Sequence, residues 1–287
     1  MDISIIIPCY NEEGAVTTTL KEIQNNVKMD TLSQIICVDD GSTDNTRMEI
    51  EKAAAQNPAI KLVCHEKNRG YGASLKTGIR HTTSDLVIIT DADGTYPFDN
   101  IKDLLEHAGT ADMVVGARTG ADVVYSHVRR IPKVFLKHYA SWLSNYSIPD
   151  INSGFRIFRR SKALEFIKIL PDGFSFTTTI TLAMLINGYT VKFVPIGYRP
   201  RIGHSKIRPI RDTINFVQLI VRTGIYFAPL RVFMPLVVFL TSVFLVSLGY
   251  DIIWLNDITD KTLIFMFASM NTLIFALLAD MIDKRSS

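Results

Sequence analysis

Two long runs without a charged residue constrain what this chain of 287 residues can fold into. The first run, VFMPLVVFLTSVFLVSLGY, covers residues 232–250, and the second, TLIFMFASMNTLIFALLA, covers residues 262–279. Each approaches the roughly 20 residues that a helix needs to cross a lipid bilayer. A pair of core helices in a large soluble domain is the alternative, but neither run has a polar face. The pattern therefore predicts a hairpin of two membrane-spanning helices.

Charges around the two runs predict how the hairpin lies in the membrane. The connecting segment, residues 251–261, carries three Asp and one Lys. Basic residues flank the outer ends of the runs: Arg208, Arg211, Arg222, Arg231, Lys284 and Arg285. Because basic flanks stay on the cytoplasmic side, we expect both termini in the cytoplasm, as in a two-span protein of a prokaryotic plasma membrane. The expected units are a cytosolic domain over 1–210, a juxtamembrane amphipathic helix over 211–231 and two transmembrane helices over 232–282.

The N-terminal part alternates strand and helix patterns. Apolar runs rich in β-branched residues predict strands over residues 3–8, 34–38, 60–64, 86–90 and 113–115. Helical patterns lie between them, near residues 13–27, 43–56, 72–82 and 98–108. Continuous apolar strands separated by helices predict an α/β fold, a mostly parallel sheet with helices on both faces. Such sheets bind ligands beyond the carboxyl ends of their strands.

Net charge and cysteine content narrow the classes of partner and cofactor. The formal net charge is +3, which gives no sign of a nucleic-acid partner. The three cysteines, Cys9, Cys37 and Cys64, lie in or beside predicted strands and share no CxxC spacing. We therefore expect reduced thiols rather than disulfides or a zinc site.

Polar side chains follow four of the predicted strands. The stretches concerned are Pro8-Cys9-Tyr10-Asn11-Glu12, Asp39-Asp40-Gly41-Ser42, Asn68-Arg69-Gly70-Tyr71-Gly72 and Asp91-Ala92-Asp93. Each alone is typical of a turn followed by a helix N-cap. Four on one rim predict a binding site, although the usual glycine-rich nucleotide fingerprints are absent.

Asp91 and Asp93 place two carboxylates one residue apart at the end of a buried strand. Alternate positions of an extended chain point the same way, so the two charges would repel unless a cation lay between them. Magnesium and manganese prefer oxygen ligands, and magnesium is often held by one or two carboxylates together with substrate phosphates. The alternative is a pair of helix-capping residues. We expect Mg²⁺ or Mn²⁺ at this position.

Five ordered stretches resemble the family 2 glycosyltransferases, and among them the dolichyl- and polyprenyl-phosphate sugar synthases such as dolichol-phosphate mannose synthase. The stretches are IIIPCYNEE, VDDGSTDNT, NRGYGASLKTG, DADGTYP and NSGFRIFRR, within residues 1–230. The resemblance implies a GT-A fold that binds a nucleotide-sugar. Gly94 replaces a larger residue of many relatives, so the resemblance implies no metal ligand at that position.

The same resemblance implies roles for particular residues. Those implied to bind the nucleotide-sugar are Pro8, Tyr10, Asn11, Glu12, Asp39, Asp40, Lys67, Gly70, Asp91, Ala92, Asp93, Arg201 and Lys206. Asp91 and Asp93 match the metal-binding Asp-x-Asp. Arg201 and Lys206 belong to a basic stretch that positive-inside charge also explains.

The chemistry that we hypothesise is attack of a lipid monophosphate oxygen on the anomeric carbon, with inversion. A phosphate monoester has a second pKa of about 6 and needs no strong base. The candidate catalytic residues are Asp93, Asp150, Arg118 and Arg130, with Asp150 as an optional base or orienting carboxylate. The candidates for contacting the acceptor phosphate are Arg118, Arg129, Arg130, Lys133 and Ser153. Residues 123–148 mix basic and apolar side chains, which suits a membrane interface or an amphipathic helix on the sheet.

The expected partners are a nucleotide-sugar, a polyprenyl phosphate, the membrane and, through the spans, a second copy of the chain. GDP-mannose and UDP-glucose both remain open as donors. A processive polysaccharide synthase is a rival, but no Gln-x-x-Arg-Trp precedes Trp142 or Trp254. A non-catalytic membrane scaffold is another rival, which would have no need of so charged a rim.

Overall fold

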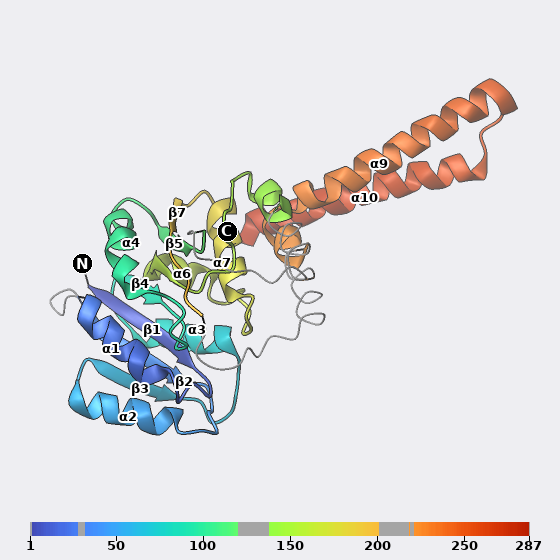
Figure 1. Cartoon of the computed structure of the whole chain (residues 1–287). Helices are drawn as coiled ribbons and strands as arrows, with labels where there is room; N and C mark the ends of the chain where they lie inside the picture. The colour runs from blue at the N-terminus through green and yellow to red at the C-terminus, as the bar shows by residue number, and fades with distance from the viewer. Residues whose placement is uncertain (1, 28–31, 120–137, 201–217, 219–220, 287) are drawn as a thin grey trace.

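The computed structural model describes residues 2–27, 32–119, 138–200, 218 and 221–286. Within them the chain forms an α/β domain from which two long helices project as a hairpin (Figure 1). The N-terminus lies on the side of the domain away from the hairpin.

A sheet of seven strands forms the centre of the domain, in the order β3-β2-β1-β4-β6-β5-β7. The strands are β1 (Ile3–Cys9), β2 (Leu32–Asp39), β3 (Ile60–Cys64), β4 (Leu86–Ile89), β5 (Met113–Ala117), β6 (Arg156–Arg159) and β7 (Val191–Pro195). Strand β6 runs antiparallel to both of its neighbours, whereas the other pairings are parallel. The mostly parallel sheet predicted from the sequence is confirmed.

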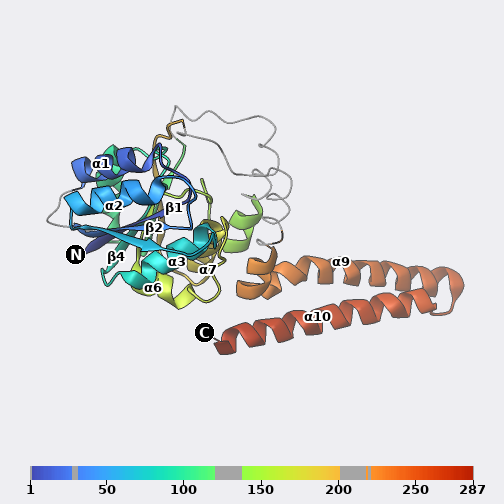
Figure 2. The same cartoon turned by 90° about the horizontal axis from the view of Figure 1, so that it is seen from below.

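Helices cover both faces of the sheet, as Figure 2 shows for the first half of the chain. One face packs against α1 (Val16–Asn26), α2 (Thr46–Gln56) and α4 (Ile101–Ala108), which follows a short 3₁₀ turn, Phe98–Asn100. The other packs against α3 (Tyr71–His81), α6 (Arg160–Phe166) and α7 (Phe176–Ile186). Strand β1 serves both cores, because Ile5 and Ile7 face one layer and Ile6 faces the other. This alternation follows from the two-residue period of a strand.

The register of β6 decides which loops meet at the carboxyl edge. Arg156 pairs with Ile89 of β4 and with Val115 of β5. Because β6 is antiparallel, the chain that leads into Arg156 lies beside the chain that leaves Ile89. Residues 150–155 therefore lie at the same edge as Asp91. The sequence reasoning did not predict β6, β7, α6 or α7.

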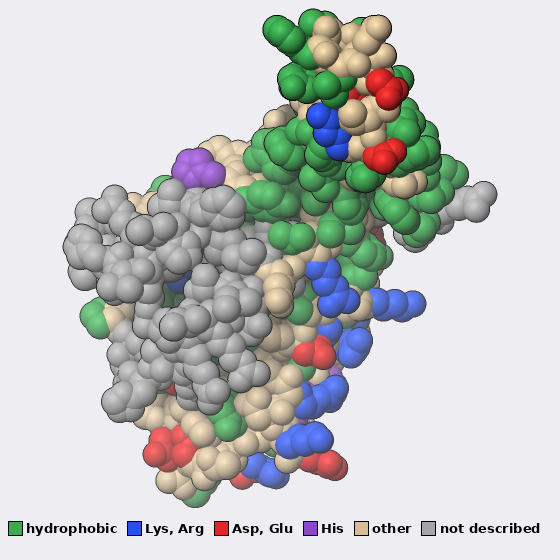
Figure 3. Space-filling view, turned by 90° about the vertical axis from the view of Figure 1, so that its right-hand side faces the viewer, with side chains coloured by type: hydrophobic (Ala, Val, Ile, Leu, Met, Phe, Trp, Pro, Cys, Tyr) green, Lys and Arg blue, Asp and Glu red, His purple; other side chains and the backbone are tan. Residues whose placement is uncertain are grey.

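The two projecting helices are α9 (Pro229–Tyr250) and α10 (Asp260–Ser286), joined by a π-helical turn over Asp251–Leu255 and a short loop. They are long and apolar enough to cross a membrane by length and composition. Figure 3 shows hydrophobic side chains over the hairpin, and Lys and Arg side chains on the adjacent face of the domain. Most of the hairpin's apolar surface has no protein cover. A lipid environment accounts for this better than water.

Candidate functional site

The loops after β1 and β2 hold each other through backbone and side-chain hydrogen bonds. The amide of Asn11 donates to Ser42 Oγ at 3.0 Å, and the amide of Thr43 donates back to Asn11 Oδ1 at 2.8 Å. The amide of Glu12 donates to Thr46 Oγ1 at 2.7 Å. Asn11 has φ of 52°, a left-handed conformation that Asn tolerates better than most residues. Pro8 and Tyr10, which precede this turn, are partly exposed beside it.

Asp39 and Asp40 follow each other in sequence but have different surroundings. Asp40 accepts hydrogen bonds from the amides of Arg69 and Gly70 at 2.9 and 2.8 Å, and it pairs with His65 Nδ1 at 2.6 Å. The Asp40 carboxylate thus holds the loop that carries the exposed Lys67. The Asp39 side chain is buried, and its Oδ1 accepts a bond from the amide of Ser42 at 3.1 Å.

The Gly70-Tyr71-Gly72 turn packs against residues 171–174. Gly70 has φ of 103°, and a Cβ there would lie 2.6 Å from the carbonyl oxygen of Asp172. A Cβ at Gly72 would collide with the carbonyl of Pro171. Both positions therefore need glycine. The Tyr71 ring between them is stacked on Phe174, with centroids 5.7 Å apart.

Asp91 lies among Tyr71, Tyr96 and Gly154. A Cβ on Gly154 would meet both carboxylate oxygens of Asp91 at 2.9 Å, so the Gly154 backbone lies directly against that carboxylate. Burial raises the pKa of Tyr71, and the negative charge of Asp91 raises it further. For Tyr96 the pKa is also raised, first by burial, while the Arg118 charge acts in the opposite direction. The Tyr96 hydroxyl accepts a bond from the Gly154 amide at 2.7 Å.

Asp93 is buried and held in place by the next turn. Its Oδ1 accepts bonds from the Thr95 amide at 3.1 Å and from the Thr95 hydroxyl at 2.6 Å. Ala92 between the two aspartates is buried, and its carbonyl accepts a bond from Thr19 Oγ1 at 3.0 Å. These bonds fix Asp93 and the backbone of Ala92 at the end of β4.

The donor set suits a hard divalent cation that also binds substrate oxygens. Among the described residues, no three His, Cys, Asp or Glu side chains group closely enough to hold a metal by themselves. Asp91 and Asp93 supply only carboxylate oxygens, the ligand type that Mg²⁺ and Mn²⁺ prefer. Magnesium characteristically binds through one or two carboxylates and completes its shell with phosphates and water. The two residues therefore fit a metal that arrives with a diphosphate.

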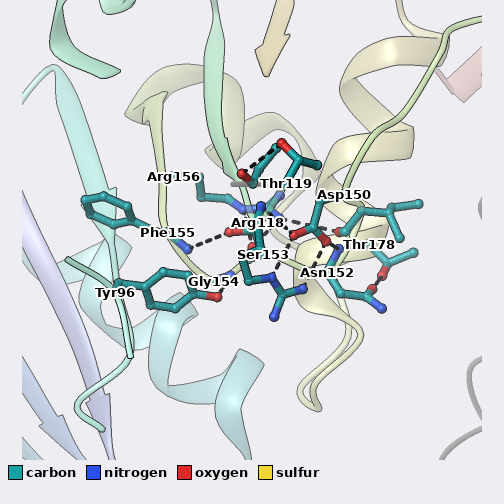
Figure 4. Close-up of polar contacts among 12 residues, drawn as sticks. Tyr96, Arg118, Thr119, Asp150, Asn152, Ser153, Gly154, Phe155, Arg156 and Thr178 are labelled. Atoms are coloured by element: carbon teal, nitrogen blue, oxygen red, sulfur yellow. Dashed lines mark hydrogen bonds and ion pairs between the residues drawn. The ribbon is translucent and has the colours of Figure 1, made fainter. Parts of the chain in front are cut away.

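The loop before β6 carries an ion pair (Figure 4). Arg118 donates from Nε to Asp150 Oδ2 at 2.7 Å and from Nη2 to Asp150 Oδ1 at 2.9 Å, and its amide donates to Oδ2 at 3.1 Å. The Asn152 amide donates to Asp150 Oδ1 at 3.1 Å. The Arg118 guanidinium also lies over the Tyr198 ring, 5.2 Å from its centroid.

This pairing sets the protonation state of both groups. Burial alone would raise the pKa of Asp150, but the hydrogen bonds and charge of Arg118 outweigh it and hold that pKa below its ordinary value. Arg118 has its pKa raised, because the nearby phenol and carboxylate groups outweigh the effect of burial. An aspartate that is ion-paired and low in pKa orients its partner better than it accepts a proton.

Arg156 is a site residue that the sequence reasoning did not single out. Its side chain is fully buried, and it contacts the carbonyl oxygens of Ser153 and Thr177. Ser153 is buried as well, and its Oγ accepts a bond from the Phe155 amide at 3.3 Å. The order of polar residues in NSGFRIFRR gave no sign that the Arg156 side chain is buried. Its burial depends on strand β6, which the sequence did not predict.

The structure thus brings together the residues predicted on the rim of β1, β2 and β4 with Arg118, Asp150 and Ser153. Five other candidates lie outside the described residues: Arg129, Arg130, Lys133, Arg201 and Lys206. The proposed roles of these five remain predictions.

Two relatives match this chain over 72% of its length. A dolichyl-phosphate hexose transferase of Haloferax volcanii is 29% identical over 211 residues, which cover 72% of this chain and 87% of the relative. An undecaprenyl-phosphate mannosyltransferase of Micrococcus luteus is 28% identical over 216 residues, covering 72% of this chain and 88% of the relative. Both names describe sugar transfer to a polyprenyl or dolichyl phosphate.

Solved structures of a GT-A glycosyltransferase share the fold. Glucosyl-3-phosphoglycerate synthase from Mycobacterium tuberculosis, in complex with Mn²⁺, UDP and phosphoglyceric acid, matches with a TM-score of 0.60 at 19% identity, covering 77% of this chain and 76% of the other. The same enzyme with Mn²⁺ and UDP-glucose matches with a TM-score of 0.61 at 18% identity, covering 78% and 79%. The predicted GT-A fold is confirmed.

The sequence profile of Glycosyl transferase family 2 matches residues 4–166. This range includes the rim of β1, β2 and β4, the Arg118–Asp150 pair and Arg156. The chain belongs to glycosyl transferase family 2 and is a glycosyltransferase.

Proposed function

We propose that this enzyme transfers a hexose from a nucleoside diphosphate sugar to a polyprenyl or dolichyl monophosphate, at the cytoplasmic surface of a membrane, with inversion of the anomeric centre. The observation that carries the proposal is the contact between Gly154 and Asp91. It places the loop of Asp150 and Arg118 directly beside the carboxylates suited to a metal-bound diphosphate. Donor and acceptor groups of a transferase must meet at such a junction.

The nucleotide-sugar side is assigned to the loops after β1, β2 and β4. Pro8, Tyr10 and Asn11 are partly exposed, and Asp39 lies next to them at the end of β2. Asp91 and Asp93 would hold Mg²⁺ or Mn²⁺, which when bound neutralises charge on a departing diphosphate. The solved neighbours with Mn²⁺ and UDP support this use of a metal. Lys67, Arg201 and Lys206 are proposed contacts to the donor phosphates.

The acceptor side is assigned to Arg118 with Asp150. A guanidinium offers five N–H donors, so Arg118 can contact an acceptor phosphate while Asp150 fixes its orientation. The acceptor phosphate is already largely a dianion at neutral pH, so no general base is required. The lowered pKa of Asp150 suits a residue that orients Arg118. Arg129, Arg130 and Lys133 are proposed as further phosphate contacts.

The hairpin supports a lipid acceptor. An open apolar groove of about 610 Å³ lies where α9 leaves the domain, lined by Trp142, Leu230, Arg231, Met234, Pro235 and Val238. Arg231 Nη1 donates to the carbonyl of Leu143 at 2.6 Å, which ties α9 to the helical residues 138–144. The groove therefore places Trp142 of the domain beside apolar side chains of α9.

The test is to supply membranes that contain the protein with radiolabelled UDP-glucose or GDP-mannose and with undecaprenyl phosphate. We expect a labelled lipid that mild acid hydrolyses, formed with one of the two donors and only with Mg²⁺ or Mn²⁺. A β-glycosyl phosphate in the intact lipid product, formed from a donor with an α-linked sugar, would establish inversion. Label in a water-soluble polymer would instead identify a polysaccharide synthase, and no label in either fraction would leave a binding scaffold.

A further inference from the structure

Arg156 is a fully buried cation at the start of β6, between β4 and β5. Its side chain is among the largest that are completely removed from solvent in the described part of the molecule. None of the ion pairs among the described residues includes it. Moving an unpaired guanidinium out of water costs several kcal/mol unless hydrogen bonds replace its hydration. Its contacts therefore show where this cost is offset.

The Arg156 guanidinium donates to two separate pieces of chain. Its Nε donates to the Ser153 carbonyl at 3.0 Å, and Nη2 donates to the same oxygen and to the Ile151 carbonyl at 3.5 Å. Its Nη1 donates to the Thr177 carbonyl at 3.0 Å and to Thr181 Oγ1 at 2.8 Å. Arg156 thus joins the loop before β6 to helix α7.

The loop held in this way is the one that connects the two sides of the site. Asp150 at its start pairs with Arg118, and Gly154 near its end lies against Asp91. A further bond to α7 comes from Thr178 Oγ1, which donates to Asn152 Oδ1 at 2.8 Å. Removal of the guanidinium would take away the bonds that it donates to the carbonyl oxygens of residues 151 and 153, and each such loss destabilises the local conformation.

We propose that Arg156 is a positioning residue for sugar transfer: it fixes the backbone of residues 151–153 so that Asp150 aligns Arg118 with the acceptor while Gly154 stays against Asp91. This inference rests on the proposed function. Burial lowers the pKa of Arg156 to about 10, so the side chain remains a cation at neutral pH. The fixed charge and the forked geometry are both available throughout the reaction.

The variant Arg156→Lys tests the role of the forked guanidinium, because lysine keeps the positive charge but presents one ammonium group instead of a planar set of donors. Arg159→Lys is the matched control: Arg159 is on the same strand, at its other end, and is partly exposed. We expect Arg156→Lys to raise the KM for undecaprenyl phosphate and to lower kcat, each by about 10-fold, so that kcat/KM falls by about 100-fold, which corresponds to about 2.7 kcal/mol. The KM for the nucleotide-sugar should rise less than the KM for undecaprenyl phosphate, because among the described residues the guanidinium bonds to residues 151, 153, 177 and 181 and reaches the donor site only through Gly154 and Asp91.

Hydrogen exchange supplies a readout that does not depend on activity. Peptides covering residues 150–156 should exchange faster in Arg156→Lys than in the wild type, while peptides from β1 and β2 keep their protection. Arg159→Lys should leave the 150–156 peptides and both KM values unchanged. If Arg156→Lys lowered only the amount of folded enzyme, Vmax would fall, whereas both KM values and the hydrogen exchange of residues 150–156 would stay as in the wild type. That result would show the proposal to be wrong.

A second pair of variants covers the case in which Arg156→Lys does not fold. Thr181→Val removes one acceptor from Nη1 and keeps Arg156, whereas Thr181→Ser keeps the hydroxyl. We expect Thr181→Val to raise the KM for the lipid phosphate by a few-fold and Thr181→Ser to restore it. Equal behaviour of the two variants would overturn the proposal. Absence of any transfer by the wild-type protein would refute the proposed function, whereas active wild type with unaltered variants would refute only the role of Arg156.

Discussion

Arg118 and Asp150 are 32 residues apart in sequence, yet the guanidinium of one and the carboxylate of the other form two side-by-side hydrogen bonds of 2.7 and 2.9 Å. Arg118 follows β5, and Asp150 lies in the loop that leads into β6. The antiparallel pairing of these two strands brings the residues together. Both are mostly buried, which strengthens their attraction and makes the loss of either partner costly.

Asp150→Asn should lower the free energy of unfolding by about 3 kcal/mol at pH 7, because Arg118 would be left buried without its counter-charge. The folded-state pKa of Asp150 is lower than its ordinary value of 3.8. The stabilisation is therefore present above about pH 4 and is lost as the pH falls through the folded-state pKa. Thermal unfolding in detergent should show a difference between wild type and variant that is constant from about pH 5 to 8 and shrinks below pH 4.

The exposed Glu165 offers a control for this experiment, since it pairs with Lys162 at the surface. Glu165→Gln should change stability by no more than about 1 kcal/mol. A gap between wild type and Asp150→Asn that persisted undiminished at pH 3 would mean that charge is not what stabilises the pair.

Most of the rim could be predicted from sequence because it depends on local pattern. Continuous apolar strands that end in polar turns placed Asp39 and Asp91 at one edge, as a parallel sheet requires. The contact between Asp91 and Gly154 could not be predicted in the same way. It depends on a four-residue antiparallel strand inserted between β4 and β5, and its sequence, RIFR, has no distinctive period.

The different surroundings of Asp39 and Asp40 were also beyond the sequence. Both follow the apolar run of β2, and both were predicted to bind the nucleotide-sugar. Which one turns towards the His65–Gly70 loop depends on the alternation of the strand and on the distant loop itself. Sequence position alone could not separate a residue that holds the fold from one that is proposed to contact the nucleotide-sugar.

Asp39→Asn and Asp40→Asn should therefore differ in their effects. Asp40 is bound by His65 and two backbone amides, so loss of its charge should lower the melting temperature by several degrees, for about 1–3 kcal/mol. Asp39→Asn keeps the Oδ1 that accepts from Ser42 and should leave the melting temperature nearly unchanged while it raises the KM for the nucleotide-sugar. Differential scanning fluorimetry and donor kinetics measure the two effects. The reverse assignment would follow if Asp39→Asn were the less stable variant with a normal KM.

Asp93→Asn should abolish transfer without unfolding the protein. Asparagine retains the Oδ1 that accepts two bonds from Thr95, but it loses the charge that a divalent cation requires. The loss of several kcal/mol of stabilisation of the departing diphosphate should lower kcat/KM by at least about 100-fold. Thermal stabilisation by UDP or GDP should depend on Mn²⁺ in the wild type and lose that dependence in the variant. The exposed Asp103→Asn serves as the control, and an active Asp93→Asn enzyme would exclude the metal role.

Replacement of exposed apolar residues of α9 should weaken insertion into the membrane. Phe239 and Leu245 are 62% and 58% exposed in the protein, as expected for side chains that contact lipid. Two arginines at these positions should cost about 5–7 kcal/mol in a spanning helix. The fraction that resists alkaline carbonate extraction should fall for Phe239→Arg/Leu245→Arg and remain high for Phe239→Leu/Leu245→Phe. Unaltered resistance of the double arginine variant would argue against α9 as a spanning helix.

Gly154→Ala tests whether the loop before β6 and the carboxylate of Asp91 act as one unit. The added Cβ would lie 2.9 Å from both Asp91 oxygens, so either Asp91 or the loop must shift. If Asp91 shifts, the Mn²⁺ concentration needed for half-maximal activity rises, and if the loop shifts, the KM for the lipid phosphate rises through Arg118 and Asp150. A displacement of this size should lower kcat/KM by about 10-fold or more.

Gly109→Ala is the matched control, because a Cβ there meets no atom within 4 Å. Equal kinetics for the two variants, at every Mn²⁺ concentration, would show that the contact between Gly154 and Asp91 has no part in transfer.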